Sequence, residues 1–343
     1  RMIPIAAAPS SDGDESMKDN PQPHTPPLAA EPPADAIVAR GLRKVYGSGG
    51  SGGSEPALRD VDLTIPRGSF FGLLGPNGAG KSTFINILAG LVIKSAGSVE
   101  ILGHDIERAA RAAASAIGVV PQELNMDAFF TAREILEVQA GLYAVPKAAR
   151  RTDEILAAMH LSDVADNYPR TLSGGMRRRL LVAKAMVHAP PVLVLDEPTA
   201  GVDVELRHNL WTYLRGLNSR GTTILLTTHY LEEAEQLCDR IAIIHQGQVV
   251  ACDTTVALIQ RLDRKELTII LGQDLDTVPP PLAAFDAEIR PFRRLVVRYR
   301  PSQTPVADIL AAVQAADLTI LDLSTEESDL EDLFLELTGN GRS

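Results

Sequence analysis

A glycine-rich segment constrains the fold of this chain more than any other feature, and it reads Gly75-Pro76-Asn77-Gly78-Ala79-Gly80-Lys81-Ser82-Thr83. It follows an apolar run, Ser69–Leu74, that is typical of a buried strand, and it precedes a helical pattern. Glycines let backbone N–H groups close around phosphate oxygens, and a helix N-terminus adds a positive dipole end. A Gly-x4-Gly-Lys-Ser pattern between a strand and a helix therefore predicts a phosphate-binding loop rather than a chance turn. We expect Lys81 to neutralise the β- and γ-phosphates and Ser82 to ligate Mg²⁺.

Two carboxylates and a histidine follow two other apolar runs. Asp196 and Glu197 come directly after Val192–Leu195, and His229 follows Thr223–Thr228. Acidic pairs usually lie on solvated surface, but this pair ends a buried run. We therefore expect Asp196 to reach the metal site, through a water, and Glu197 to polarise or deprotonate an attacking water. An imidazole at the position of His229 can bond the γ-phosphate.

The spacing of apolar runs predicts a parallel sheet covered by helices. Further short runs at Ile117–Val120 and Ile241–Ile244 resemble strands buried on both faces, and helical stretches separate several of the runs. Between Asp127 and Pro169 such runs are missing and helical periodicity takes their place. We assign residues 36–257 to one nucleotide-binding domain and residues 123–170, approximately, to a helical subdomain within it.

The two ends of the chain differ from this body. Residues 1–35 contain eight prolines among acids and small residues, a composition that predicts a disordered arm. Residues 47–54 form a Gly/Ser loop, either a long native hairpin loop or an insertion. Residues 258–343 show new strand and helix patterns, including an acidic amphipathic helix at Ser328–Leu337. We expect a small α/β accessory domain there, with a regulatory or dimer-supporting role and no catalytic one.

Composition excludes several classes of protein. The formal net charge of −11 lacks the basic footprint of a duplex-binding protein, so no nucleic-acid partner is expected. The apolar runs are shorter than the roughly 18–20 residues that cross a bilayer, and the apolar stretch at the N-terminus is too short for a secretory signal. The two cysteines have no metal-ligand spacing, and reduced thiols of a cytosolic protein are expected. A soluble chain would reach a membrane only through a partner.

The most specific segment is Leu172-Ser173-Gly174-Gly175-Met176, a Ser-Gly-Gly turn that opens a helix at Arg177–His188. The Ser173 hydroxyl and the Gly175 N–H at a helix N-terminus make a second anion site. In this order with the phosphate loop, the carboxylate pair and His229, the turn resembles the nucleotide-binding subunit of an ABC transporter. Met176 stands where the usual residue is Gln, a variation similar to that of ABC exporters with small membrane subunits.

The resemblance implies a fold, cofactors and further site residues. The fold is an α/β P-loop NTPase core with a parallel sheet, an antiparallel β subdomain and a helical subdomain, followed here by the small C-terminal α/β domain. ATP and Mg²⁺ are the implied cofactors, Gln122 touches Mg²⁺ and the attacking water, and Tyr46 stacks on the adenine ring. Ser173, Gly174 and Gly175 meet the γ-phosphate bound to a second copy, so a homodimer is implied.

Two segments are similar to the ABC-2-type exporter branch, Thr227–Glu235 and Leu330–Leu337. They imply an ATPase that powers a separate ABC-2-type transmembrane permease and lies on the inner face of the plasma membrane through it. A soluble ABC ATPase acting on ribosomes or DNA is the alternative, although the chain has neither a second module nor a long coiled-coil insertion. A non-hydrolysing nucleotide sensor is a third hypothesis, which the presence of Glu197 and His229 disfavours.

Two adjacent phenylalanines stand out in a chain with only 4% aromatic residues. Phe129 and Phe130 follow Gln122 closely. Packing into the core of the protein itself would explain one of them. The other hypothesis is an exposed apolar surface that receives a short helix of the membrane subunit.

Overall fold

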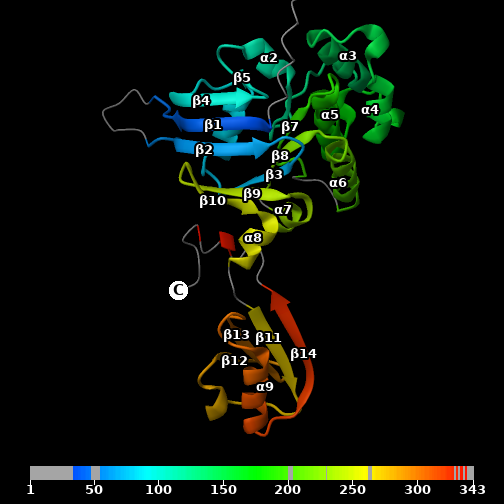
Figure 1. The fold of residues 1–343 in the computed structure, drawn as a ribbon. Coiled ribbons are helices and arrows are strands. Elements are labelled where there is room, and N and C mark those ends of the chain that lie inside the picture. The colour runs from blue at the N-terminus through cyan, green and yellow to red at the C-terminus, as the bar shows by residue number, and fades with distance from the viewer. Residues whose placement is uncertain are drawn as a thin grey trace, which may run out of the picture. The chain divides into compact units, whose positions relative to one another are not determined.

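The computed structural model of this chain describes residues 34–47, 55–199, 204–228, 230–261, 265–327, 330, 333–334 and 337 (Figure 1). The predicted arm, apart from Ala34 and Asp35, and the Gly/Ser loop, apart from Gly47, lie outside the described residues. His229 also lies outside them.

The predicted parallel sheet is confirmed. Its strand order is β10-β9-β3-β8-β7-β6, and neighbouring strands run parallel except at the antiparallel edge pair β9–β10. Every residue of the central strands β3, β7 and β8 is buried, which explains their continuous apolar sequence. The strand bounds are β3 Phe70–Leu74, β6 Ile117–Val120, β7 Val192–Asp196, β8 Thr223–Thr227, β9 Arg240–His245 and β10 Gln248–Thr254.

A separate antiparallel sheet has the order β2-β1-β4-β5 (Figure 1). In β2, Leu58, Val61, Leu63 and Ile65 are buried and exposed polar residues alternate with several of them, because only one face meets the core. That face packs with helix α1 (Lys81–Leu88), α2 (Ala110–Ser115) and one face of the parallel sheet in a single apolar cluster. The strand bounds are β1 Asp35–Lys44, β2 Leu58–Pro66, β4 Ala96–Ile101 and β5 His104–Asp105.

The other face of the parallel sheet packs with most of the remaining helices. Their buried apolar residues form one cluster with those of β3, β7 and β8. The helix bounds are α3 Ala132–Leu142, α4 Thr152–Ala158, α5 Gly174–Met186, α6 Val204–Asn218, α7 Leu231–Leu237 and α8 Thr255–Gln260, with 3-10 turns η1 Lys147–Ala149, η2 Ser162–Val164 and η3 Pro169–Thr171. In the described part of the chain, no helix is long and apolar enough to span a bilayer.

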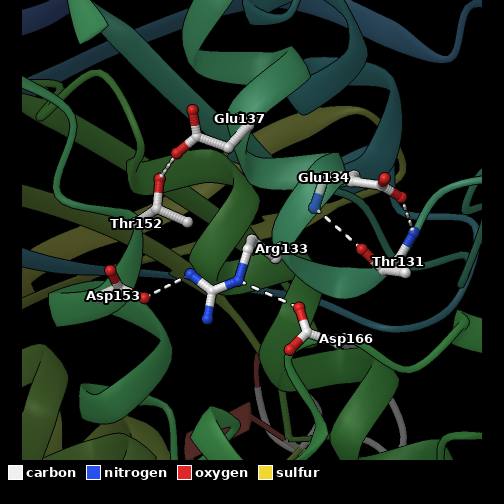
Figure 2. Close-up of polar contacts among 7 residues, drawn as sticks. All are labelled: Thr131, Arg133, Glu134, Glu137, Thr152, Asp153 and Asp166. Carbon is white, nitrogen blue, oxygen red and sulfur yellow. Dashed lines mark hydrogen bonds and ion pairs between the residues drawn. The ribbon is translucent and has the colours of Figure 1, made fainter.

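Polar contacts hold the predicted helical subdomain together (Figure 2). Helix α3 begins with a capping box, in which Thr131 Oγ1 accepts from Glu134 N at 3.3 Å and Glu134 Oε2 accepts from Thr131 N at 2.8 Å. Arg133 then binds both Asp153 of α4 and Asp166, as Figure 2 shows. These bonds join three separate segments, so the subdomain is set by side-chain pairing as well as by helix propensity.

The C-terminal part has its own antiparallel sheet, of order β12-β13-β11-β14, and its own apolar cluster with helix α9 (Val306–Ala315). The strand bounds are β11 Lys265–Leu271, β12 Asp286–Arg290, β13 Arg294–Tyr299 and β14 Ile320–Glu327, with a 3-10 turn η4 at Pro280–Leu282. The sequence pattern did not reveal β12, because this strand has charged residues at three of its five positions and none of its residues is fully buried.

The expected boundary at 257/258 differs from the packing. Leu258, in α8, is fully buried in the same cluster as the helices on the parallel sheet. After β14, Leu330 and Leu333 are buried in that cluster as well, and Leu330 N donates to Glu235 Oε1 at 2.6 Å. The predicted helix at Ser328–Leu337 is described only at residues 330, 333, 334 and 337, all of them helical. The end of the chain therefore contributes to the core of the nucleotide-binding domain.

This packing predicts the effect of truncating Leu330. Leu330→Ala should lower the free energy of unfolding by about 2–5 kcal/mol, the usual cost of removing a fully buried leucine side chain. Leu321→Ala, in the same part of the chain but 57% exposed, should change it by less than about 0.5 kcal/mol. Denaturant titration of both variants measures the difference, and equal effects would contradict the placement of Leu330 in the core.

Candidate active site

The phosphate loop joins the carboxyl end of β3 to the first turn of α1, as predicted. Two of its glycines have no room for a side chain: a Cβ at Gly75 would lie 2.3 Å from Ile244 O, and one at Gly80 would lie 2.6 Å from Ala57 O. Gly80 also has φ +110°, which other residues rarely adopt. Gly80 is the N-cap of α1 and makes no side-chain cap, so no capping side chain occupies the backbone N–H groups of the first turn.

Lys81 lies beneath this loop. Its side chain is only 6% exposed, and its Nζ donates to Gly75 O at 2.6 Å and to Pro76 O at 3.1 Å. Burial lowers the pKa of Lys81, and the charges of Glu197 and Asp196 partly offset that effect. A phosphate group bound in the loop would supply the anionic partner that this buried ammonium needs.

The two carboxylates come from the end of β7. Asp196 is its last residue, is buried, and accepts from Thr227 Oγ1 of β8 at 2.5 Å. Glu197 follows in a left-handed conformation with φ +49°, which is uncommon for a residue other than glycine. Its N–H donates to Thr227 O at 3.1 Å, so the neighbouring strand fixes the strained bend. Strained backbone of this kind is frequent at functional sites.

Gln122 and Glu197 are brought together by the sheet. Gln122 follows β6 and Glu197 follows the adjacent β7, so both lie at the same edge. Gln122 Nε2 donates to Glu197 Oε2 at 3.1 Å. The two residues line a cleft of about 360 Å³ together with the phosphate loop, and the residues around it are Ala57, Asn77, Gly78, Gly80, Lys81, Ser82, Thr83, Gln122 and Glu197.

Tyr46 lies at the rim of the same site. Its hydroxyl is 3.3 Å from Thr83 Oγ1 of α1, and its ring is 46% exposed. Lys44 Nζ lies 4.8 Å from the ring centroid, a cation–π distance. Tyr46 is therefore an exposed aromatic residue next to the first helix after the phosphate loop.

The Ser-Gly-Gly turn does not line this cleft. Ser173 is the N-cap of α5 and its Oγ accepts from Met176 N at 3.2 Å. Ser173 and Gly174 are exposed, and none of the described residues that line the cleft belongs to this turn. The turn therefore presents its helix N-terminus to solvent and not to the phosphate loop of its own chain.

One buried carboxyl was not found from the sequence. Glu233 of α7 is 1% exposed and accepts from Trp211 Nε1 at 2.7 Å and from Thr199 Oγ1 at 3.1 Å. A side-chain hydrogen bond from Thr228 also reaches it. Glu233 thus ties together the segments just after Glu197 and just before His229. The sequence pattern does not single out Glu233, because it is one of several glutamates in the short helix α7.

The burial of Glu233 predicts a pH dependence. Burial raises the pKa of Glu233, and its hydrogen bonds only partly offset this. Its contribution to stability is therefore fully present below the ordinary pKa of glutamate and is lost as the pH rises through the higher pKa of the folded state. We expect Glu233→Gln to remove this loss, so that the unfolding free energy of the wild type falls relative to that of the variant as the pH rises.

Denaturant titrations between pH 4 and pH 8 measure the difference, with Glu232→Gln as the control. Glu232 is the exposed neighbour on the same helix. Its variant should follow the wild type at every pH. A constant offset between the wild type and Glu233→Gln across the range would contradict the assignment.

The chain is similar in sequence to known ATP-binding proteins over most of its length. The ABC transporter family model matches residues 58–200. The Nod factor export ATP-binding protein I of Ralstonia nicotianae is 36% identical over 321 residues, 93% of this chain and 97% of the relative. The daunorubicin resistance ATP-binding protein DrrA3 of Streptomyces coeruleorubidus is 36% identical over 318 residues, 90% of this chain and 97% of that one. The linearmycin resistance ATP-binding protein LnrL of Bacillus subtilis is 34% identical over 311 residues, 88% of this chain and 98% of the relative.

Solved structures of ABC ATP-binding proteins are also similar to this chain. An ATP-binding subunit of an ABC transporter has a TM-score of 0.61 at 28% identity, and the match covers 66% of this chain and 93% of that one. The dimeric post-hydrolysis state of the ATP-binding cassette MJ0796 bound to ADP and Pi has a TM-score of 0.58 at 28% identity, over 64% of this chain and 98% of that one. The α/β P-loop fold predicted from the sequence is thereby confirmed.

Proposed function

Because this chain belongs to the ABC transporter family and is an ATP-binding, ATP-hydrolysing subunit of an exporter, we propose that two copies close on two ATP molecules. The observation that carries this proposal is the separation of the two anion sites within one copy. The phosphate loop lines the cleft, whereas the Ser173–Gly175 turn, in which Ser173 and Gly174 are exposed, does not. A second copy would bring its own turn over the γ-phosphate and complete the site.

Within each site the residues take distinct roles. The backbone of residues 75–83 and Lys81 hold the phosphates, and Tyr46 stacks on the adenine ring. Glu197 accepts the proton of the attacking water, and Gln122, hydrogen-bonded to Glu197, orients that water. His229, which follows Thr228 in the sequence, bonds the γ-phosphate in this proposal. The reaction needs no covalent intermediate, so positioning and charge stabilisation account for the catalysis.

The residues at the cleft also suit Mg²⁺. This ion prefers oxygen ligands and is usually held by one or two carboxylates or hydroxyls together with phosphates and waters. Ser82 offers a hydroxyl, Gln122 an amide oxygen, and the buried Asp196 a carboxylate that acts through a water. When bound there, Mg²⁺ would neutralise charge on the phosphate oxygens. Asp196 is held for this role by the bond from Thr227.

Substitution of the proposed base tests both the chemistry and the pairing of copies. Glu197→Gln should bind ATP normally and lose turnover by about 10²–10⁴-fold, the usual value of general-base catalysis. With hydrolysis blocked, ATP should hold the variant as a dimer. Phosphate release, ATP titration and size-exclusion chromatography with and without ATP measure the three properties.

Glu123→Gln is the matched control, since Glu123 is an exposed carboxylate next to Gln122 that accepts from Asn125 instead. It should keep wild-type turnover and show no ATP-stabilised dimer. Wild-type turnover in Glu197→Gln would place the base elsewhere. A Glu197→Gln variant that binds ATP but remains monomeric at every protein concentration would refute the shared site.

We further propose that the partner is a separate ABC-2-type permease, which holds this subunit on the cytoplasmic face of the plasma membrane. The export and resistance names of the relatives support this proposal. Those names specify different cargo molecules, so we assign the choice of cargo to the permease.

The docking surface proposed for the permease lies at Phe129 and Phe130. Phe129 is 86% exposed and Phe130 is 39% exposed, so the two rings are not explained by packing in the core of this protein. Phe129 N donates to Asp127 Oδ1 at 2.9 Å, which fixes the segment locally. The segment joins Gln122 to α3, so a helix bound there would be linked to the cleft through a short stretch of chain.

Substituting both phenylalanines by serine should abolish co-purification with the permease and leave basal ATP hydrolysis unchanged. The control is the double variant Leu91→Ser and Ile93→Ser, which removes another exposed apolar pair, 74% and 78% exposed, after α1. The control should retain both properties. A Phe129/Phe130 variant that still co-purifies with the permease and still transports would show that docking occurs elsewhere.

A further inference from the structure

A buried arginine joins the helix that carries the Ser-Gly-Gly turn to the catalytic edge of its own chain. Arg178 lies five residues after Ser173 on α5 and is 5% exposed. Its Nη1 donates to Pro121 O at 3.1 Å and to Gln122 O at 2.8 Å. Both carbonyls follow directly on the end of β6, where the strand pairing with β7 has stopped. Arg178 therefore supplies the hydrogen bonds that the sheet no longer provides.

Burial of the Arg178 guanidinium costs folding free energy. In the described part of the chain, Arg178 has no carboxylate within ion-pair distance, and its buried Nε has no hydrogen-bond partner. Burial lowers the pKa of Arg178, which only the more distant charges of Glu197 and Asp196 offset. Buried charges without a directly bonded counterion usually cost stability.

The contacts continue from Arg178 to the proposed base. The main chain of Gln122 is held by Arg178, and the side chain of Gln122 donates to Glu197 at 3.1 Å. A peptide carbonyl fixed by a guanidinium restricts the backbone rotation of Gln122, and with it the direction of the amide group. The N-terminus of the same helix is the Ser173 turn, which faces solvent.

We propose that Arg178 is a positioning residue that holds Gln122 against Glu197. It thereby links the turn that serves the second copy's ATP to the base of its own site. A displacement of α5 would move the Gln122 amide relative to Glu197. This inference rests on the proposed roles of Gln122, Glu197 and Ser173.

The chain offers a matched control in the next residue. Arg179 is 7% exposed, and its Nη1 donates to Met159 O at 2.7 Å and His160 O at 3.2 Å. Both arginines are thus buried on one helix and donate from Nη1 to a pair of adjacent carbonyls. The carbonyls bound by Arg179 lie at the end of α4 in the helical subdomain, away from the cleft. If Arg178 acted only through the stability of the fold, its substitution would also lower the melting temperature and leave kcat unchanged.

Steady-state kinetics of Arg178→Gln and Arg179→Gln separate the two roles. Arg178→Gln should lower kcat by about 10- to 100-fold, as expected when a catalytic group is misplaced, and change the affinity for ATP by less than about twofold. Arg179→Gln should lower the melting temperature to a similar extent and keep kcat. Arg178→Lys should recover part of kcat, because an ammonium can donate to the same two carbonyls.

A double-mutant cycle with Gln122→Ala tests whether Arg178 acts through Gln122. In the Gln122→Ala background, Arg178→Gln should produce little further loss of kcat. Multiplicative losses in the double variant would overturn the proposal, and so would a wild-type kcat in Arg178→Gln. A parallel loss of ATP affinity and kcat in both Arg178→Gln and Arg178→Lys would also overturn it, since it would show a structural role.

Failure of the proposed site gives a different result. If Gln122→Ala and Glu197→Gln both hydrolyse ATP at the wild-type rate, the roles of those residues are refuted and the inference falls with them. If both lose turnover and Arg178→Gln does not, the site stands and only the inference about Arg178 is refuted.

Discussion

The parallel pairing of β3, β8 and β7 is the constraint on which the rest of the site depends. Thr227 is paired with Leu73 on one side and with Asp196 on the other, so the three strands end at the same level. The phosphate loop, the carboxylate pair and the segment after β8 therefore leave the sheet side by side. Because side chains alternate along a strand, a shift of one residue in β7 would turn Asp196 to the opposite face and separate it from Thr227.

Buried charge at this edge is held mainly by the main chain. Lys81 and Arg178 both donate to carbonyl groups. The negative charges of Glu197 and Asp196 favour the charged forms of these two cations. Burial lowers the pKa of both cations.

Sequence patterns located the elements of the site with different success. The limits of β6 were predicted to the residue, and those of β3, β7 and β8 to within one residue. A continuous apolar run bounded by loops leaves little choice of where the strand begins and ends. The antiparallel β subdomain was predicted without strand limits, since its half-exposed strands have a weaker signal. The packing of Leu258 and Leu330 crosses the expected domain boundary, because an amphipathic pattern shows that one face of a helix is buried but not which core it joins.

Local sequence is sufficient to predict the phosphate loop, the carboxylates at the end of β7 and the Ser-Gly-Gly turn, because in each of these patterns composition and spacing specify the chemistry. Three sets of hydrogen bonds become visible only in the folded chain. Gln122 donates to Glu197, Thr199 and Trp211 donate to Glu233, and Arg178 donates to the main chain of Gln122. These partners are far apart in the chain, and their contacts arise from strand order and helix packing, which no local pattern encodes.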